Sequence, residues 1–432
     1  MFDFGFVLTS EHETLKHGNF ALYSSGMVPE LRKQFNAQFS MEKYREFLRR
    51  MDQRCGTEIH FRVSETPCFF PSELASKLTL YGNELVEQLL GNPAYRKASD
   101  AAIPKDWNVP SETADPMWMC VDFGLVREPD GTIEPKLVEL QAFPSLYAYQ
   151  PQLAEEFIEY YNLSSTLTPF LDGLETLSYT KLLERAIVAG HSRENVVLLE
   201  IDPVEQKTLP DFLLTQRMLD IPIVNLRNVT KEGRRIFYKI NGKHTHIARI
   251  YNRCIVDELI KKQITPPFDY RDELDVEWAG HPNWYYRISK FSIPWLKHKC
   301  VPRTWYLDQL YTGKLETLEL PLAREELLLK PLYSFAGAGI VFAPDDAQLN
   351  AIPVTARHDY ILQERVHFTP VIETPHGLTQ AEIRVMYVWL PGEKMKPVLL
   401  LVRMGRGKMM GVDHNRNLEW VGGSVGLMDT QK

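Results

Sequence analysis

The stretch that most constrains the fold is Trp118–Tyr149, where the sequence predicts a β-hairpin. Apolar residues alternate around Asp122 within Met119–Val126, which is the pattern of a strand. The polar turn that follows contains Asp130-Gly131, a pair that favours tight hairpin turns. The second strand is expected over Lys136–Phe143. The fold must therefore contain a sheet to which this hairpin belongs.

Three oxygen donors are predicted on one face of this hairpin. Glu139 and Gln141 are two positions apart, so on a strand their side chains point to the same side. The hairpin can place Asp122 beside them on the neighbouring strand. Carboxylate and amide oxygens suit Mg²⁺, which takes hard ligands and often bridges to phosphates. Spacing alone leaves open an alternative, in which the acids of an edge hairpin are simply solvated.

Length and composition set broader limits. A chain of 432 residues is too long for one ordinary core, so two or three lobes are expected. The net charge of −7 argues against broad binding to nucleic acid. The five cysteines are scattered without a CxxC pair, which indicates neither a disulfide framework nor a zinc site. With no signal peptide or membrane-spanning apolar run found, we expect a cytoplasmic protein without a membrane partner. A homo-oligomer stays open.

A small α/β lobe is predicted in the middle of the chain. Asn195–Ile201 is almost continuously apolar, like a strand of a buried parallel sheet. A helical segment and the strand Ile221–Leu226 complete a β-α-β order. An Asn-Gly hairpin, Ile236–Tyr251, follows, and Arg249 and Arg253 alternate onto one face at its end. Two guanidinium groups there suit a carboxylate or phosphate, and solvated arginines on an edge strand are the alternative.

The last third of the chain carries candidates for phosphate binding. Leu327–Lys330 predicts a short strand that ends in a lysine, and a small-residue loop, Ser334–Gly339, leads into the strand Ile340–Phe342. Small residues let backbone N–H groups approach a phosphate, and Lys330 can reach the same group. The Walker order is absent, so a plain hairpin turn is the alternative. Tyr360–Val366 predicts a further strand, which carries Gln363 and Glu364.

Together these motifs resemble the ATP-grasp superfamily over roughly residues 117–428. The hairpin resembles its metal hairpin, LLLKPLYSFAGAGIVF its lysine and phosphate loop, and YILQERV its adenine-binding strand. EIRVMYV and LLLVRMGRG resemble its paired strands, which end in a phosphate- or substrate-contacting arginine. The metal hairpin precedes the lysine loop here. That order is similar to circularly permuted members, namely eukaryotic-type glutathione synthetase and glutathionylspermidine-synthase-like proteins.

The resemblance implies an α/β (α+β) fold class, with an ATP-grasp fold in circularly permuted order and an inserted Rossmann-like α/β substrate lobe. Residues 1–165 are expected to hold a helical region and the metal hairpin of the ATP-grasp body. Residues 166–280 are expected to form the substrate lobe, and residues 281–432 the nucleotide-binding lobes.

The resemblance also implies an ATP- and Mg²⁺-dependent ligase that joins a carboxylate to an amine through an acyl phosphate. The implied metal ligands are Asp122, Glu139 and Gln141, and the implied acyl-substrate contacts are Arg253 and Arg403. The implied nucleotide-binding residues are Lys290, Lys330, Ser334, Gly337, Gly339, Gln363, Glu364 and Val366.

The chain departs from the glutathione synthetase pattern at three positions in these motifs. Gln141 replaces an asparagine, Ser334 replaces an acidic metal ligand, and Cys120 replaces an arginine. Two other functions therefore stay open. One is a kinase that phosphorylates a small molecule without ligation, and the other is a non-catalytic nucleotide-binding regulatory protein.

Overall fold

The computed structural model describes residues 27–312, 317–334, 337–407, 410 and 417–430. Its α-helices, in chain order, are α1 (Pro29–Gln38), α2 (Met41–Cys55), α3 (Ser72–Leu90), α4 (Pro93–Ser99), α5 (Tyr149–Tyr160), α6 (Thr176–Ile187), α7 (Leu209–Leu219), α8 (Val256–Lys261), α9 (Asn283–Arg287) and α10 (Asp346–Asn350). No helix in this part of the chain is both long and apolar enough to cross a membrane.

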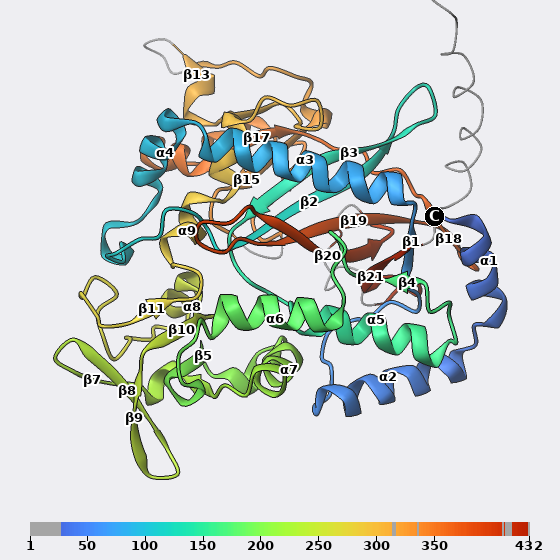
Figure 1. The fold of residues 1–432 in the computed structure, drawn as a ribbon. Coiled ribbons are helices and arrows are strands. Elements are labelled where there is room, and N and C mark those ends of the chain that lie inside the picture. Colours follow the sequence, from blue (N-terminus) through green and yellow to red (C-terminus); the bar gives the residue numbers. More distant parts are fainter. Residues whose placement is uncertain (1–26, 313–316, 335–336, 408–409, 411–416, 431–432) are drawn as a thin grey trace, which may run out of the picture.

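An eight-stranded sheet lies at the centre of the molecule (Figure 1), with β4 and β18 paired at its side and the order β1-β21-β20-β19-β2-β3 along its main path. Its strands are β1 (Cys68–Phe70), β2 (Trp118–Arg127), β3 (Ile133–Gln141), β4 (Leu167–Thr168), β18 (Ile372–Thr374), β19 (Gly377–Val388), β20 (Lys396–Gly405) and β21 (Gly422–Asp429). The predicted hairpin is confirmed as the antiparallel pair β2–β3. Because β2 also pairs with β19, strands from the first and last thirds of the chain share one sheet.

Helices cover both faces of this sheet (Figure 1). On one face lies α3, with an apolar stripe that recurs at helical spacing from Leu74 to Leu89 and packs against Met119, Val121 and Phe123 of β2. On the other face, α6 packs against β19 and β20, while α1, α2 and α5 cover β21. Both faces of β2 are therefore buried. Because its side chains alternate between the two faces, any polar side chain on β2 must find its hydrogen-bond partners inside the protein.

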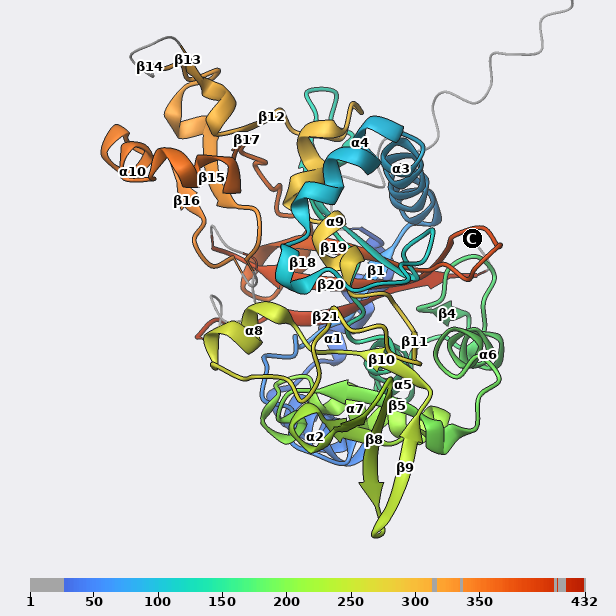
Figure 2. The ribbon, with the colours of Figure 1, turned by 90° about the vertical axis from the view of Figure 1, so that its left-hand side faces the viewer.

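The α/β lobe is built around a four-stranded parallel sheet with the order β11-β10-β5-β6. Its strands are β5 (Val196–Glu200), β6 (Ile223–Asn225), β10 (Arg249–Asn252) and β11 (Glu277–Trp278). The predicted β-α-β order is confirmed by β5, α7 and β6, and β5 pairs in parallel with β6. A three-stranded antiparallel arm, β7 (Thr230–Glu232), β8 (Arg235–Ile240) and β9 (Lys243–Ile247), projects from this lobe (Figure 2).

The assignment of the segment after this arm needs a correction. The hairpin is confirmed only for β8 and β9, and Arg249–Asn252 does not continue it. Those residues form β10, a fully buried strand that lies between β5 and β11. The sequence pattern misleads here because a short apolar strand looks the same at an edge and in the centre of a sheet.

A second four-stranded sheet, with the order β12-β17-β15-β16, forms a separate lobe beside the central sheet (Figure 2). Its strands are β12 (Thr304–Tyr306), β15 (Leu327–Pro331), β16 (Val341–Phe342) and β17 (Tyr360–Glu364), with the short pair β13 (Tyr311–Thr312) and β14 (Thr317–Leu318) nearby. The predicted strands with Lys330 and Gln363 are confirmed as β15 and β17, and the structure shows that these two pair antiparallel.

Candidate functional site

A cavity of about 370 Å³ lies between this sheet and the central sheet. Its lining comes from β3, β15, β16, β17, β19 and β20 and from the loops beside them. It brings together six residues that the sequence singled out, which are Glu139, Lys330, Gly337, Gln363, Val366 and Arg403. These residues are up to 264 positions apart, so the cavity is a product of the tertiary fold rather than of one motif.

Lys330 presents a buried ammonium group to this cavity. The alternation of β15 turns Leu328 and Lys330 to the cavity, while Leu327 and Leu329 pack in the core behind it. The Nζ of Lys330 donates to the Oε1 of Gln363 at 2.5 Å. Burial lowers the pKa of Lys330 to about 8 against the attraction of nearby carboxylates. The site therefore holds a cation whose charge is sensitive to pH just above neutrality.

The small-residue loop after Lys330 needs its glycines. Gly337 and Gly339 have φ angles of +74° and +75°, which side chains rarely tolerate. A Cβ on Gly339 would lie 3.0 Å from the Cγ of Pro331. Two residues of the predicted loop, 335 and 336, lie outside the described residues. The described part of the loop brings Gly337 to the cavity, as a phosphate-binding loop requires.

Four charged side chains form a network at the cavity, in which Glu382 and Arg403 line it and Asp122 and Arg384 lie behind them. The Nε and Nη2 of Arg384 donate to the two carboxylate oxygens of Asp122, each at 2.7 Å. Arg403 donates to Asp122 and to Glu382. Burial opposes ionisation of Asp122, but the two arginines outweigh it and hold the pKa of Asp122 below its usual value. Asp122 is thus an ionised, fully enclosed carboxylate whose oxygens are both in use.

Glu139 lies opposite Asp122 in the strand register, and its own cationic neighbour is Lys290. The Nζ of Lys290 is 3.6 Å from the Oε2 of Glu139 and donates to the backbone carbonyl of Ser334 at 2.9 Å. Gln141 turns its Nε2 toward the Oε1 of Glu139, at 3.5 Å. Glu139, Lys290 and Ser334 therefore meet at one point, although they come from three separate elements.

These contacts fit a magnesium ion poorly. The three predicted ligands share a face as expected, since Asp122 pairs with Glu139 and Cys120 with Gln141 in the β2–β3 register. Asp122, however, has no free oxygen, and Glu139 already faces an ammonium group. In the described parts of the chain, no three His, Cys, Asp or Glu side chains are arranged to hold a metal ion. The metal role of these residues stays a prediction, and their contacts argue against it.

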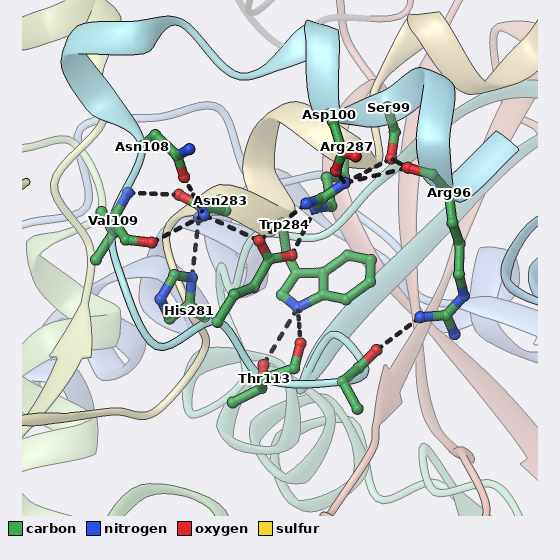
Figure 3. A network of polar contacts seen from close by, with 12 residues as sticks. Arg96, Ser99, Asp100, Asn108, Val109, Thr113, His281, Asn283, Trp284 and Arg287 are labelled. Carbon is green, nitrogen blue, oxygen red and sulfur yellow. Dashed lines mark hydrogen bonds and ion pairs between the residues drawn. The ribbon is translucent and has the colours of Figure 1, made fainter. Parts of the chain in front are cut away.

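A polar network fixes the position of Lys290, which begins the 3₁₀ helix η6 (Lys290–Trp295) directly after α9. Arg287 of α9 reaches the carboxylate of Glu112, with a distance of 3.0 Å from Nη2 to Oε2. Asn283 exchanges two hydrogen bonds with the backbone of Val109, at 2.9 and 3.0 Å. Figure 3 shows how this network joins α9 to the segment between α4 and β2. Lys290 therefore follows a helix that this network joins to the segment before β2.

Glu364 does not lie with the other predicted nucleotide-binding residues. Strand alternation turns Gln363 toward the cavity and places Glu364 on the opposite side, near Leu362. Its carboxylate pairs with Arg303, with a distance of 3.0 Å from Nη2 to Oε1. A nucleotide contact by Glu364 can therefore come only from its backbone.

Arg253 and Arg249 have separate places in the α/β lobe. Arg249 donates to the last carbonyls of α6, Ala186 O and Ile187 O, which is a structural role. Arg253 follows β10 and is only 4% exposed, but its Nε and Nη1 have no hydrogen-bond partner. The two arginines are four positions apart along an extended segment, which is about 13 Å, so they do not hold one ligand between them. Arg253 remains a candidate for an anionic substrate, outside the main cavity.

Sequence reasoning missed several charged residues at the cavity. Glu382 lies on its lining, and Arg384, on the same strand β19, binds Asp122 behind it. Arg406 lines it after β20 and donates to Thr379 and Thr374. The sequence did carry a signal, because EIRVMYVWL places an acid and a base two positions apart inside an otherwise apolar strand. Buried charges of this kind need partners, and here the partners are functional candidates.

No protein-family model matches the sequence, and no curated protein matches it. Among solved structures, a glutathione synthetase-like effector from Globodera pallida, in its apo form, is similar. The two share 10% identity with a TM-score of 0.57, and the match covers 93% of this chain and 99% of that chain. At this identity the likeness concerns the fold alone, and it shows a glutathione synthetase-like fold.

Proposed function

We propose that the chain is an ATP-dependent ligase that joins a carboxylate to an amine through an acyl-phosphate intermediate. The observation that carries the proposal is one cavity in which Lys330, Gln363, Arg403 and the loop at Gly337 converge. The glutathione synthetase-like fold supports it, because such a fold suits a ligase of this type. Basic side chains and a glycine loop are what a transferring phosphoryl group requires.

The proposed reaction has two steps. A carboxylate oxygen of the first substrate attacks the γ-phosphorus of ATP, and ADP leaves. The nitrogen of the second substrate then attacks the carbonyl carbon, phosphate leaves, and the amine loses its proton to solvent. Such chemistry depends on positioning and on the neutralisation of charge rather than on a covalent nucleophile.

The side chains have distinct proposed roles. Lys330 and Lys290 neutralise the phosphates, and the backbone at Gly337 and beyond covers them. The segment Gln363–Val366 reaches the cavity where β17 ends, and its backbone there is proposed to bind adenine. Arg403 lies beside the acyl phosphate, while Arg253 binds a carboxylate of the substrate from the α/β lobe. Mg²⁺ remains a proposal from the sequence alone.

The test is product analysis after incubation with ATP and a panel of small carboxylates and amines. ADP, phosphate and a new amide in equal amounts are the expected products, detected by chromatography and mass spectrometry. A stable phosphorylated compound without an amide would indicate the kinase instead. ATP binding without any ADP formation would favour the non-catalytic regulatory protein. One observation supports that alternative, because Arg384 occupies both oxygens of Asp122, a predicted metal ligand.

A further inference from the structure

We propose that the ammonium group of Lys290 serves as a built-in cation, so that the cavity binds the polyphosphate of a nucleotide without a divalent metal ion. The proposal rests on the proposed nucleotide site and specifies the ligand as uncomplexed ATP. It starts from the disagreement between the predicted magnesium ligands and their observed contacts.

The position of Lys290 is the first observation. Its Nζ lies between the Oε2 of Glu139, at 3.6 Å, and the carbonyl and hydroxyl oxygens of Ser334, at 2.9 and 3.4 Å. Glu139 belongs to the hairpin and Ser334 to the loop after Lys330. A metal ion bound by Glu139 and by a ligand at position 334 would lie between the same hairpin and loop, where Lys290 now lies. Lys290 is only 6% exposed, so these contacts hold its ammonium group in place.

The second observation concerns the remaining carboxylates. The guanidinium group of Arg384 takes both oxygens of Asp122, and Arg403 binds both Asp122 and Glu382. Each acid near the predicted metal position thus already has a cation of the protein beside it. A divalent ion added there would be repelled at close range by ammonium and guanidinium groups in a partly desolvated site.

The charge of the cavity wall points the same way. Its lining contains four Lys and Arg side chains, Lys330, Arg365, Arg403 and Arg406, against two acids, Glu139 and Glu382. Lys290 adds a further positive charge beside Glu139. An excess of cations suits the full negative charge of a free triphosphate better than its metal complex, in which that charge is partly neutralised.

The decisive experiment is isothermal titration calorimetry of the full chain with ATP, in excess EDTA and in millimolar Mg²⁺. We expect dissociation constants that agree within about threefold. Affinity that rises about tenfold or more with Mg²⁺ would overturn the proposal and leave the nucleotide site intact. Absence of binding in both conditions would overturn the nucleotide site itself and this proposal with it.

A variant sharpens the comparison. Lys290→Met keeps the apolar stem and removes the charge. ATP affinity in EDTA should fall about tenfold or more, and Mg²⁺ should restore part of it, because Glu139 then lacks its cation. Unchanged affinity in EDTA would contradict the proposal. Lys97→Met, at an exposed lysine of α4, is the matched control. Melting curves check folding, and the wild-type comparison decides the question if Lys290→Met does not fold.

Discussion

At the scale of single residues, two buried ionisable groups have shifted pKa values that lead to testable pH effects. Lys330 presents an ammonium to the cavity with its pKa lowered to about 8, mainly by burial. Glu200, at the end of β5, has its pKa raised to about 8, again mainly by burial and against the attraction of Arg253. Lys330 loses its charge above about pH 8, and Glu200 loses its charge below about pH 8. We therefore expect the effect of Lys330 on ATP binding and the effect of Glu200 on stability in different pH ranges.

The first prediction concerns ATP affinity and pH. Affinity should hold steady in neutral solution and fall as pH rises through about 8, because Lys330 then loses the proton that attracts the phosphates. Calorimetric titrations at pH steps from neutral to strongly basic measure this. Lys330→Arg keeps its charge over that range and should flatten the profile. A flat wild-type profile would remove Lys330 from the phosphate site.

The second prediction concerns stability. The folded state holds a proton on Glu200 that the unfolded chain, with an ordinary pKa of 4.5, releases. Unfolding therefore releases a proton between pH 4.5 and about 8, and stability should fall as pH rises through this window. Glu200→Gln stays neutral and should lessen the fall in melting temperature. Glu58→Gln, whose side chain is 75% exposed, is the control. Equal slopes for wild type and Glu200→Gln would contradict this account.

At the scale of elements, the β2–β3 hairpin carries two acids that should behave differently. Asp122 sits in a buried ion pair, so Asp122→Asn should destabilise the fold by about 3–5 kcal/mol even in EDTA. Glu139, with its side chain 27% exposed, should tolerate Gln with a change of about 1 kcal/mol or less. Denaturant unfolding of both variants tests the pair. Equal tolerance of both substitutions would show that Arg384 does not hold Asp122 as described.

The contact of α3 with the sheet gives another prediction. A Cβ on Gly82 would lie 1.9 Å from the hydroxyl oxygen of Tyr387, which also donates to Thr79 O. Glycine to alanine in a helix usually stabilises by about 0.5–1 kcal/mol. Gly82→Ala should instead lower the melting temperature, because Tyr387 must move. Tyr387→Phe with Gly82→Ala should recover part of the loss. A stabilised single variant would mean that α3 is not packed this closely.

The elements also show how far the sequence could lead. The hairpin was predictable because strand alternation and an Asp-Gly turn are local signals. The side of β17 that faces the cavity was not, since alternation separates Gln363 from Glu364 without saying which is inside. That β10 is an inner strand was not predictable either, because its neighbours in the sheet, β5 and β11, are distant from it in the sequence. Arg384 escaped notice because its partner, Asp122, lies 262 positions away.

At the scale of the whole molecule, the candidate site depends on how separate sheets meet. The central sheet supplies the carboxylates and arginines, the four-stranded sheet of β12, β15, β16 and β17 supplies Lys330 and Gln363, and the α/β lobe supplies Arg253. The central claim is that ATP binds in the cavity between the first two sheets.

A crystal structure with a non-hydrolysable ATP analogue tests this claim most directly. The account predicts the triphosphate against Lys330 and the loop at Gly337, with adenine beside Gln363–Val366. An analogue bound elsewhere on the chain, or an empty cavity at saturating analogue, would contradict it.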